Sequence, residues 1–148
     1  MVKKAVKPDL SMVAIFILAL LAIPRVVFHD LRIVPLDSLV YTIAAIAPFV
    51  IWLGFALFRK NKRPFRDFLI VGLTFGLLLA ATHQLLWSAS WGENLPHVGG
   101  NLAGKLSPGV EEIVLRVAAL ISSLLTGAVA GVVLGAVATV AAKVRSRI

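Results

Sequence analysis

Four long runs of apolar residues, separated by short polar stretches, divide this chain of 148 residues. The pattern predicts transmembrane helices over residues about 9–28, 38–58, 68–88 and 113–142. Residues 38–58 contain no charged side chain, and a helix of that length crosses a hydrocarbon core of about 30 Å at about 1.5 Å per residue. The sequence therefore predicts an all-α, polytopic integral membrane protein, a single domain of four transmembrane helices with an extracytoplasmic loop over 89–110.

Composition agrees with this interpretation. Hydrophobic residues make up 59% of the chain and charged residues only 15%, whereas a soluble domain usually contains about a quarter charged residues. A globular protein of this composition would leave too much apolar surface in water, which favours a membrane protein. The chain has no cysteine, and this excludes disulfides, thiol catalysis and cysteine-based metal sites.

The net charge of +8 is unevenly distributed along the chain. With four spans, both termini and residues 59–67 share one side and carry eleven Lys and Arg, against four on the other side. The positive-inside rule then places both termini in the cytoplasm, in a plasma membrane. Because the basic clusters flank apolar runs, no nucleic-acid partner is needed to explain them. Candidates for binding anionic lipid head groups are Arg59, Lys60, Lys62, Arg63 and Arg66.

Small residues recur at every fourth position of the third and fourth predicted spans. The candidate helix-packing residues are Gly72, Gly76 and Ala80 on the third span and Gly127, Gly131 and Gly135 on the fourth. In lipid, such rows let two helix backbones approach closely. Depth counted from the charged ends pairs Gly76 with Gly135 and Ala80 with Gly131. A second small row on the fourth span leaves open a homo-oligomer or a partner membrane protein.

Two polar residues near the outer end of the third span, His83 and Gln84, are the most informative candidates for a site. Their spacing from Gly76 and Ala80 directs them toward the fourth span, where we expect them to meet Ser122, Ser123 or Thr126. One interpretation is an interhelical hydrogen bond of about 0.6 kcal/mol. The other is a proton relay or a ligand contact, because ionisable groups inside a membrane are costly to keep.

The predicted outer face also gathers imidazoles and carboxylates, which are ligands suited to zinc. The members of this candidate metal set are His29, Asp30, His97, Glu111 and Glu112. No HExxH motif or comparable tight spacing is present, so a metal site is the minority interpretation and we expect no cofactor.

No catalytic motif appears, and no acidic residue interrupts the core of a predicted span. We therefore expect a non-enzymatic binding, accessory or transport-related membrane component without catalytic residues. One alternative is a membrane-embedded enzyme or metal-binding protein with an outer-face site around His83, His97 and Glu112. Another is an oligomeric pore or channel.

Overall fold

The structure is a computed structural model that describes residues 9–60, 62–92 and 94–147. Its elements are α1 (Met12–Leu20), α2 (Ile23–Asp30), α3 (Leu39–Phe58), α4 (Pro64–Leu85), α5 (Trp87–Trp91), the 3₁₀ turn η1 (Gly100–Leu102) and α6 (Pro108–Arg145). The described residues are therefore all-helical, as expected. Four helical stretches are long and apolar enough to cross a membrane: α1 with α2, α3, α4 and α6.

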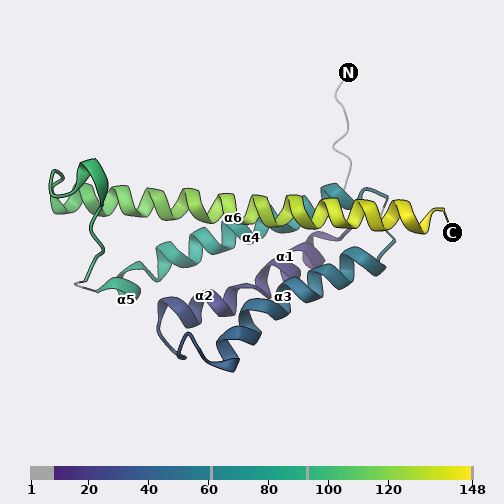
Figure 1. The fold of residues 1–148 in the computed structure, drawn as a ribbon, viewed down its shortest axis with the longest axis horizontal. Helices are drawn as coiled ribbons and strands as arrows, with labels where there is room; N and C mark the ends of the chain where they lie inside the picture. The colour runs from purple at the N-terminus through teal and green to yellow at the C-terminus, as the bar shows by residue number, and fades with distance from the viewer. Residues whose placement is uncertain (1–8, 61, 93, 148) are drawn as a thin grey trace, which may run out of the picture.

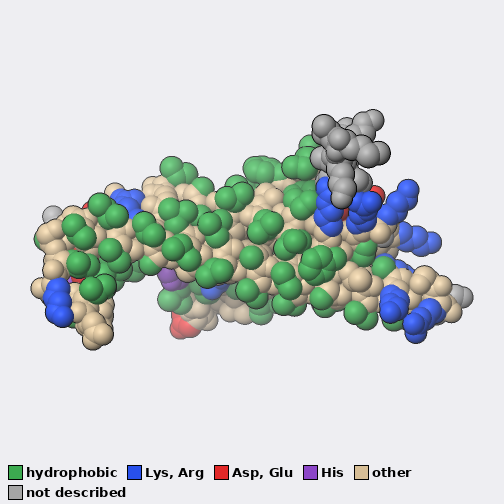
Figure 2. All heavy atoms as spheres, turned by 90° about the horizontal axis from the view of Figure 1, so that it is seen from above, with side chains coloured by type: hydrophobic (Ala, Val, Ile, Leu, Met, Phe, Trp, Pro, Cys, Tyr) green, Lys and Arg blue, Asp and Glu red, His purple; other side chains and the backbone are tan. Residues whose placement is uncertain are grey.

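The helices lie roughly along one axis, and α6 runs the whole length of the molecule (Figure 1). Helix α4 is central, because it packs against α6 and also against α1 and α2. Apolar side chains cover the middle of the molecule, while Lys and Arg gather at the end where the C-terminus lies (Figure 2). We call that end the basic end. The opposite end, which holds His29, His83 and His97, is called the histidine end.

The first predicted span is interrupted, which differs from the continuous helix expected over 9–28. Helix α1 ends at Leu20, and α2 begins at Ile23 with Pro24 in its first turn. Proline lacks an amide hydrogen and clashes with the carbonyl four residues earlier, so it is tolerated at the start of a helix rather than inside one. The interruption therefore follows from Pro24.

Trp52 of α3 compensates for this break. The N–H of Ala22 bonds to the carbonyl of Ala19 in a tight turn, so the carbonyl of Leu18 lacks its usual helical partner. The Trp52 indole N–H donates to that carbonyl at 2.8 Å, and Trp52 is fully buried. In an apolar environment an unsatisfied carbonyl costs several kcal/mol, so this bond ties α3 to the interruption of the first span.

Helices α4 and α6 approach each other backbone to backbone through their glycines. A Cβ on Gly72 would overlap Gly127 and Gly131, and a Cβ on Gly127 would overlap Gly72 and Gly76. These positions can be occupied only by glycine at this helix separation. The seam expected from the sequence is present, but its register differs from the expected one.

Gly76 lies against Ser123 and Gly127, and Gly135 lies against Phe65. Gly131 lies against Leu69 and Gly72, so the expected pairings of Gly76 with Gly135 and of Ala80 with Gly131 were both wrong. The expected register assumed that α4 begins at residue 68. It begins instead at Pro64, which occupies the first helical turn, and the described part of α6 continues to Arg145. The end of α6 therefore reaches past the beginning of α4.

Two carboxylates hold the start of the described chain against α4 at the basic end. Asp67 is fully buried and accepts the backbone N–H groups of Asp9 and Leu10, each at 3.2 Å. Asp9 in turn accepts the N–H groups of Lys62 and Arg63. These bonds link the segment before α1, the α3–α4 connection and α4.

Helix α6 extends beyond the other helices at the histidine end (Figure 1). It contains 38 residues, so it is about 57 Å long. It begins at Pro108, before the predicted start at about residue 113, and the side chain of the preceding Ser107 makes no capping hydrogen bond. The first turns of α6 therefore stand clear of the bundle and receive the loop that follows α5.

Candidate ligand site at the histidine end

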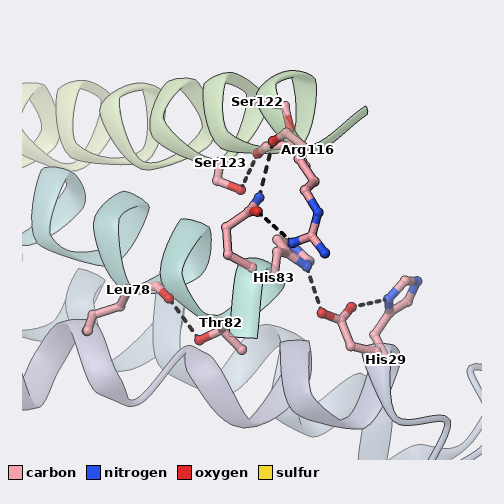
Figure 3. A network of polar contacts seen from close by, with 10 residues as sticks. His29, Leu78, Thr82, His83, Arg116, Ser122 and Ser123 are labelled. Atoms are coloured by element: carbon pink, nitrogen blue, oxygen red, sulfur yellow. Dashed lines mark hydrogen bonds and ion pairs between the residues drawn. The ribbon is translucent and has the colours of Figure 1, made fainter. Parts of the chain in front are cut away.

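A buried carboxylate shared by two histidines forms the centre of the histidine end (Figure 3). Asp30 is the last residue of α2, and its side chain is 6% exposed. Its Oδ2 lies 2.7 Å from Nδ1 of His83, and its Oδ1 lies 3.0 Å from Nδ1 of His29. An ionised carboxylate only accepts hydrogen bonds. Each histidine therefore donates from Nδ1, which leaves Nε2 for other contacts.

The position of Asp30 explains why it needs these donors. The C-terminal end of a helix carries a partial negative charge, so a carboxylate there is disfavoured. Burial adds a further cost unless the charge is hydrogen-bonded. The two imidazoles offset both costs. The one from His83 also brings the last turn of α4 to α2.

The partner expected for His83 was wrong. Its spacing along α4 predicted a contact with Ser122, Ser123 or Thr126, but its hydrogen bond is to Asp30. The three hydroxyls bond back to carbonyls of their own helix, Ser122 and Ser123 to Ala119 and Thr126 to Ser122. Hydroxyls in helices commonly satisfy themselves in this way, and a carboxylate is the stronger acceptor for an imidazole.

Gln84 also has a different partner from the expected serines and threonine. Its side-chain amide donates to the carbonyl of Arg116 at 3.1 Å and accepts from the Arg116 guanidinium at 3.3 Å. The same guanidinium pairs with Glu112 at 2.9 Å and lies 4.7 Å from the centre of the Trp87 ring. Through Arg116, the Glu112–Arg116 pair connects α6 to α4 and α5.

The five candidate metal ligands are divided among three separate contacts. His29 and Asp30 join His83, as described above. His97 lies 3.3 Å from Glu111, which also accepts the N–H of Val98. Glu112 binds Arg116, so His83, His97 and Glu112 do not form one site. Across residues 9–60, 62–92 and 94–147, no group of three or more suitable side chains is placed to hold a metal ion.

Two cavities open beside His29, and Asp30 lines the larger one. The larger, about 560 Å³, is lined by residues that include His29, Asp30, Arg32, Ser90 and Trp91. The smaller, about 240 Å³, lies between α2, α3, α4 and α6. His29 lines both, so the shared carboxylate and its histidines stand at their junction. Ligand sites are commonly about 300–1,000 Å³ with a few convergent polar groups.

The smaller cavity collects most of the polar residues that the sequence singled out. Its lining includes His29, His83, Ser122, Ser123 and Thr126. The candidates are thus brought around a common space, although His83 makes no hydrogen bond to the hydroxyls. Arg25 of α2 also lines this cavity and lies 5.7 Å from the centre of the Tyr41 ring. Arg25, Arg32 and Ser90 were not among the site residues predicted from the sequence.

The predicted lipid-contacting residues lie at the basic end. A cavity of about 210 Å³ is lined there by Lys60, Ala142, Arg145 and Ser146. Arg145 donates to the carbonyl of Arg59 at 3.1 Å, which brings the end of α6 to the end of α3. The structure therefore adds Arg145 to the cluster expected from the α3–α4 connection.

Comparisons of the sequence with protein-family profiles, curated proteins and solved structures find no match. Functional inference therefore depends on the geometry of the chain itself. The histidine end offers hydrogen-bond donors, fixed charges and an apolar wall around a cavity. This arrangement is suited to recognising a small molecule.

Proposed function

We propose that the protein is a four-span plasma-membrane protein, with both termini cytoplasmic, that binds a small molecule at its histidine end. In this topology the histidine end faces outward. Four sufficiently long apolar helices support insertion, and the imbalance of eleven to four in Lys and Arg supports the orientation. The role is non-enzymatic: a binding or transport-related component.

The observation that carries this proposal is the cavity of about 560 Å³ beside the Asp30 carboxylate, whose two oxygens each accept a hydrogen bond from a histidine. A buried charge at the end of a membrane helix is costly, and such groups commonly mark functional sites. An apolar side chain in place of Asp30 would avoid this cost. We propose that the Asp30–histidine pair is retained because it shapes and orients the binding site.

The orientation can be tested directly because the chain has no cysteine. Single cysteines at Ala103, in the loop before α6, and at Ser146, after α6, are suitable reporters. In intact cells a membrane-impermeant maleimide is expected to label Ala103→Cys. It should label Ser146→Cys only after the cells are permeabilised. The reverse pattern would contradict the proposed topology.

Binding can be tested with small aromatic probes that differ only in their polar group: benzoate, phenyl phosphate, benzylammonium and benzyl alcohol. Each is titrated by calorimetry into the purified protein in lipid nanodiscs. We expect saturable, one-to-one binding of at least one probe, and loss of that binding in Ser90→Phe, which fills the cavity. Leu36→Trp, a change at an exposed residue of the cavity rim, provides a second blocking variant. If no probe binds, or if neither variant weakens binding, the proposed site is wrong.

At the basic end we propose a second, simpler contact with anionic lipid. Lys60 and Arg145 line one cavity from different helical ends. The nearby carboxylates of Asp9 and Asp67 accept backbone N–H groups. Cations near the cytoplasmic surface attract anionic head groups by about 1 kcal/mol each, and this supports the lipid contact that the sequence suggests.

A further inference from the structure

We infer that the molecule bound at the histidine end carries an anionic group, a carboxylate or a phosphate, received by Arg32 and Ser90. This inference rests on the proposed function and specifies the chemical class of the ligand. The anionic group would lie against Arg32 and Ser90, with an apolar part of the same molecule against Trp91.

The first argument is the balance of charge around the cavities. Both oxygens of Asp30 are already engaged by histidines. Within the described part of the chain, neither Arg32 nor Arg25 forms an ion pair with a carboxylate. Arg116, by contrast, is paired with Glu112. Arg32 lines the larger cavity and Arg25 the smaller one, each without a carboxylate partner. The N–H donors of these guanidinium groups favour a bound carboxylate or phosphate.

Ser90 provides the second argument. Its hydroxyl oxygen is buried and, among the residues that the structure describes, has no hydrogen-bond partner. Buried polar groups are almost always hydrogen-bonded, so each exception calls for an explanation. Because Ser90 lines the larger cavity together with Arg32, an acceptor on a bound molecule would satisfy it. A carboxylate or phosphate offers several such acceptors.

The backbone at Arg32 is the third argument. Its φ of 51° makes Arg32 the one non-glycine residue with positive φ in the described chain. Glycine adopts this conformation without strain, whereas arginine does not. A side chain held at a position that favours glycine is consistent with a functional requirement for that side chain. Guanidinium groups are well suited to carboxylate and phosphate, which they bind through two parallel hydrogen bonds.

The other residues that line the larger cavity indicate the chemistry of the non-anionic part of the ligand. Val34, Pro35 and Leu36 from the α2–α3 connection and Trp91 of α5 provide apolar surface. A purely inorganic anion would leave this surface unused. The geometry points to an amphipathic anion with a compact apolar body rather than to free phosphate.

The variant Arg32→Gly separates an effect on ligand binding from an effect on the stability of the fold. Glycine relieves the strained backbone, so we expect the thermal midpoint to be unchanged or raised. It also removes the guanidinium, so binding of benzoate and phenyl phosphate should weaken by about tenfold to hundredfold, the range for a lost charge-assisted hydrogen bond. Lys105→Gln is the matched control, because Lys105 is an exposed cation at the same end outside the cavity lining.

Titration of the probes into the nanodisc-embedded protein gives the test. We expect benzoate or phenyl phosphate to bind at least tenfold more tightly than benzylammonium, benzyl alcohol or inorganic phosphate. Equal or tighter binding of benzylammonium or benzyl alcohol, abolished by Ser90→Phe, would overturn the anion inference and leave the proposed binding site standing. Anion binding unchanged in Arg32→Gly would also overturn the inference. If no probe binds, the inference and the proposed function both fail.

Discussion

The two ends of the molecule use their carboxylates in opposite ways. At the basic end, Asp9 and Asp67 accept backbone N–H groups, and they fasten one segment of chain to another. At the histidine end, Asp30, Glu111 and Glu112 contact side chains of histidine or arginine. The first use fixes the backbone of the fold, whereas the second orients side chains, and at Asp30 it does so beside a cavity. The difference supports placing the proposed ligand site at the histidine end.

The seam between α4 and α6 connects these two ends. Its glycines hold the helix backbones in contact, while the end of α4 places His83 and Gln84 beside α2 and the first half of α6. A closely packed helix pair therefore positions the side chains of the proposed site, as precise recognition would require.

Disrupting the seam should have the largest effect on both ends at once. In Gly72→Leu, the new side chain would overlap the backbones of Gly127 and Gly131, so the helices must separate. We expect destabilisation of about 3 kcal/mol or more, because overpacking against a rigid backbone cannot relax locally. Thermal unfolding in detergent measures the change. Gly54→Leu is the control, since a Cβ at Gly54 meets no atom within 4 Å; equal losses in the two variants would contradict the seam.

Substitution of Asp30 should affect the histidine end alone. Asp30→Ala leaves His29 and His83 without their shared acceptor, and we expect a loss of about 1–3 kcal/mol in stability together with weakened probe binding. Asp37→Ala serves as the control because Asp37 is exposed at the same end. Unchanged stability and binding in Asp30→Ala would show that the carboxylate does not organise the site.

Asp67→Asn tests whether a change at the basic end leaves the histidine end unaffected. Asparagine retains one acceptor oxygen, so one of the two bonds from Asp9 and Leu10 is weakened or lost, at a cost of about 1 kcal/mol. Probe binding at the histidine end should be unchanged. The measurements are the thermal midpoint and the calorimetric titration. A large loss of probe binding would indicate that the two ends are not independent.

The smallest effect is expected for lipid contact at the basic end. Lys60→Gln removes one of the two cations of that cavity and should weaken retention of phosphatidylglycerol about fivefold, at about 1 kcal/mol per cation. Native mass spectrometry in mixed micelles measures the bound lipid, and higher salt should reduce the difference. Lys105→Gln is the matched control at the other end. An equal effect of that control would indicate general charge rather than a lipid site.

Much of the fold follows from periodicity, because four long apolar runs have few alternatives to membrane-length helices. The interruption between α1 and α2 was signalled by Pro24, which outweighs the apolar continuity of the first run. The helix register was not predictable from charge positions alone. Asp67 is charged but buried within α4, so it does not mark where a helix leaves the apolar layer.

The site was predictable only in part, for a related reason. His83 was identified from its depth in an apolar run, but its partner lies 53 residues away on α2. The spacing of residues along α4 indicates the direction in which the His83 side chain points. It does not indicate that α2 lies there as well as α6. Arg32 carried no signal of a binding site, because its significance comes from a positive φ and a cavity that arise from tertiary packing.

The most direct test of the central claim is a calorimetric titration of phenyl phosphate into wild-type protein and Arg32→Gly in nanodiscs, with thermal midpoints measured in parallel. We predict saturable one-to-one binding to the wild type and binding weakened at least tenfold in a variant that is no less stable. Absence of binding to the wild type, or equal binding to both proteins, would contradict the account.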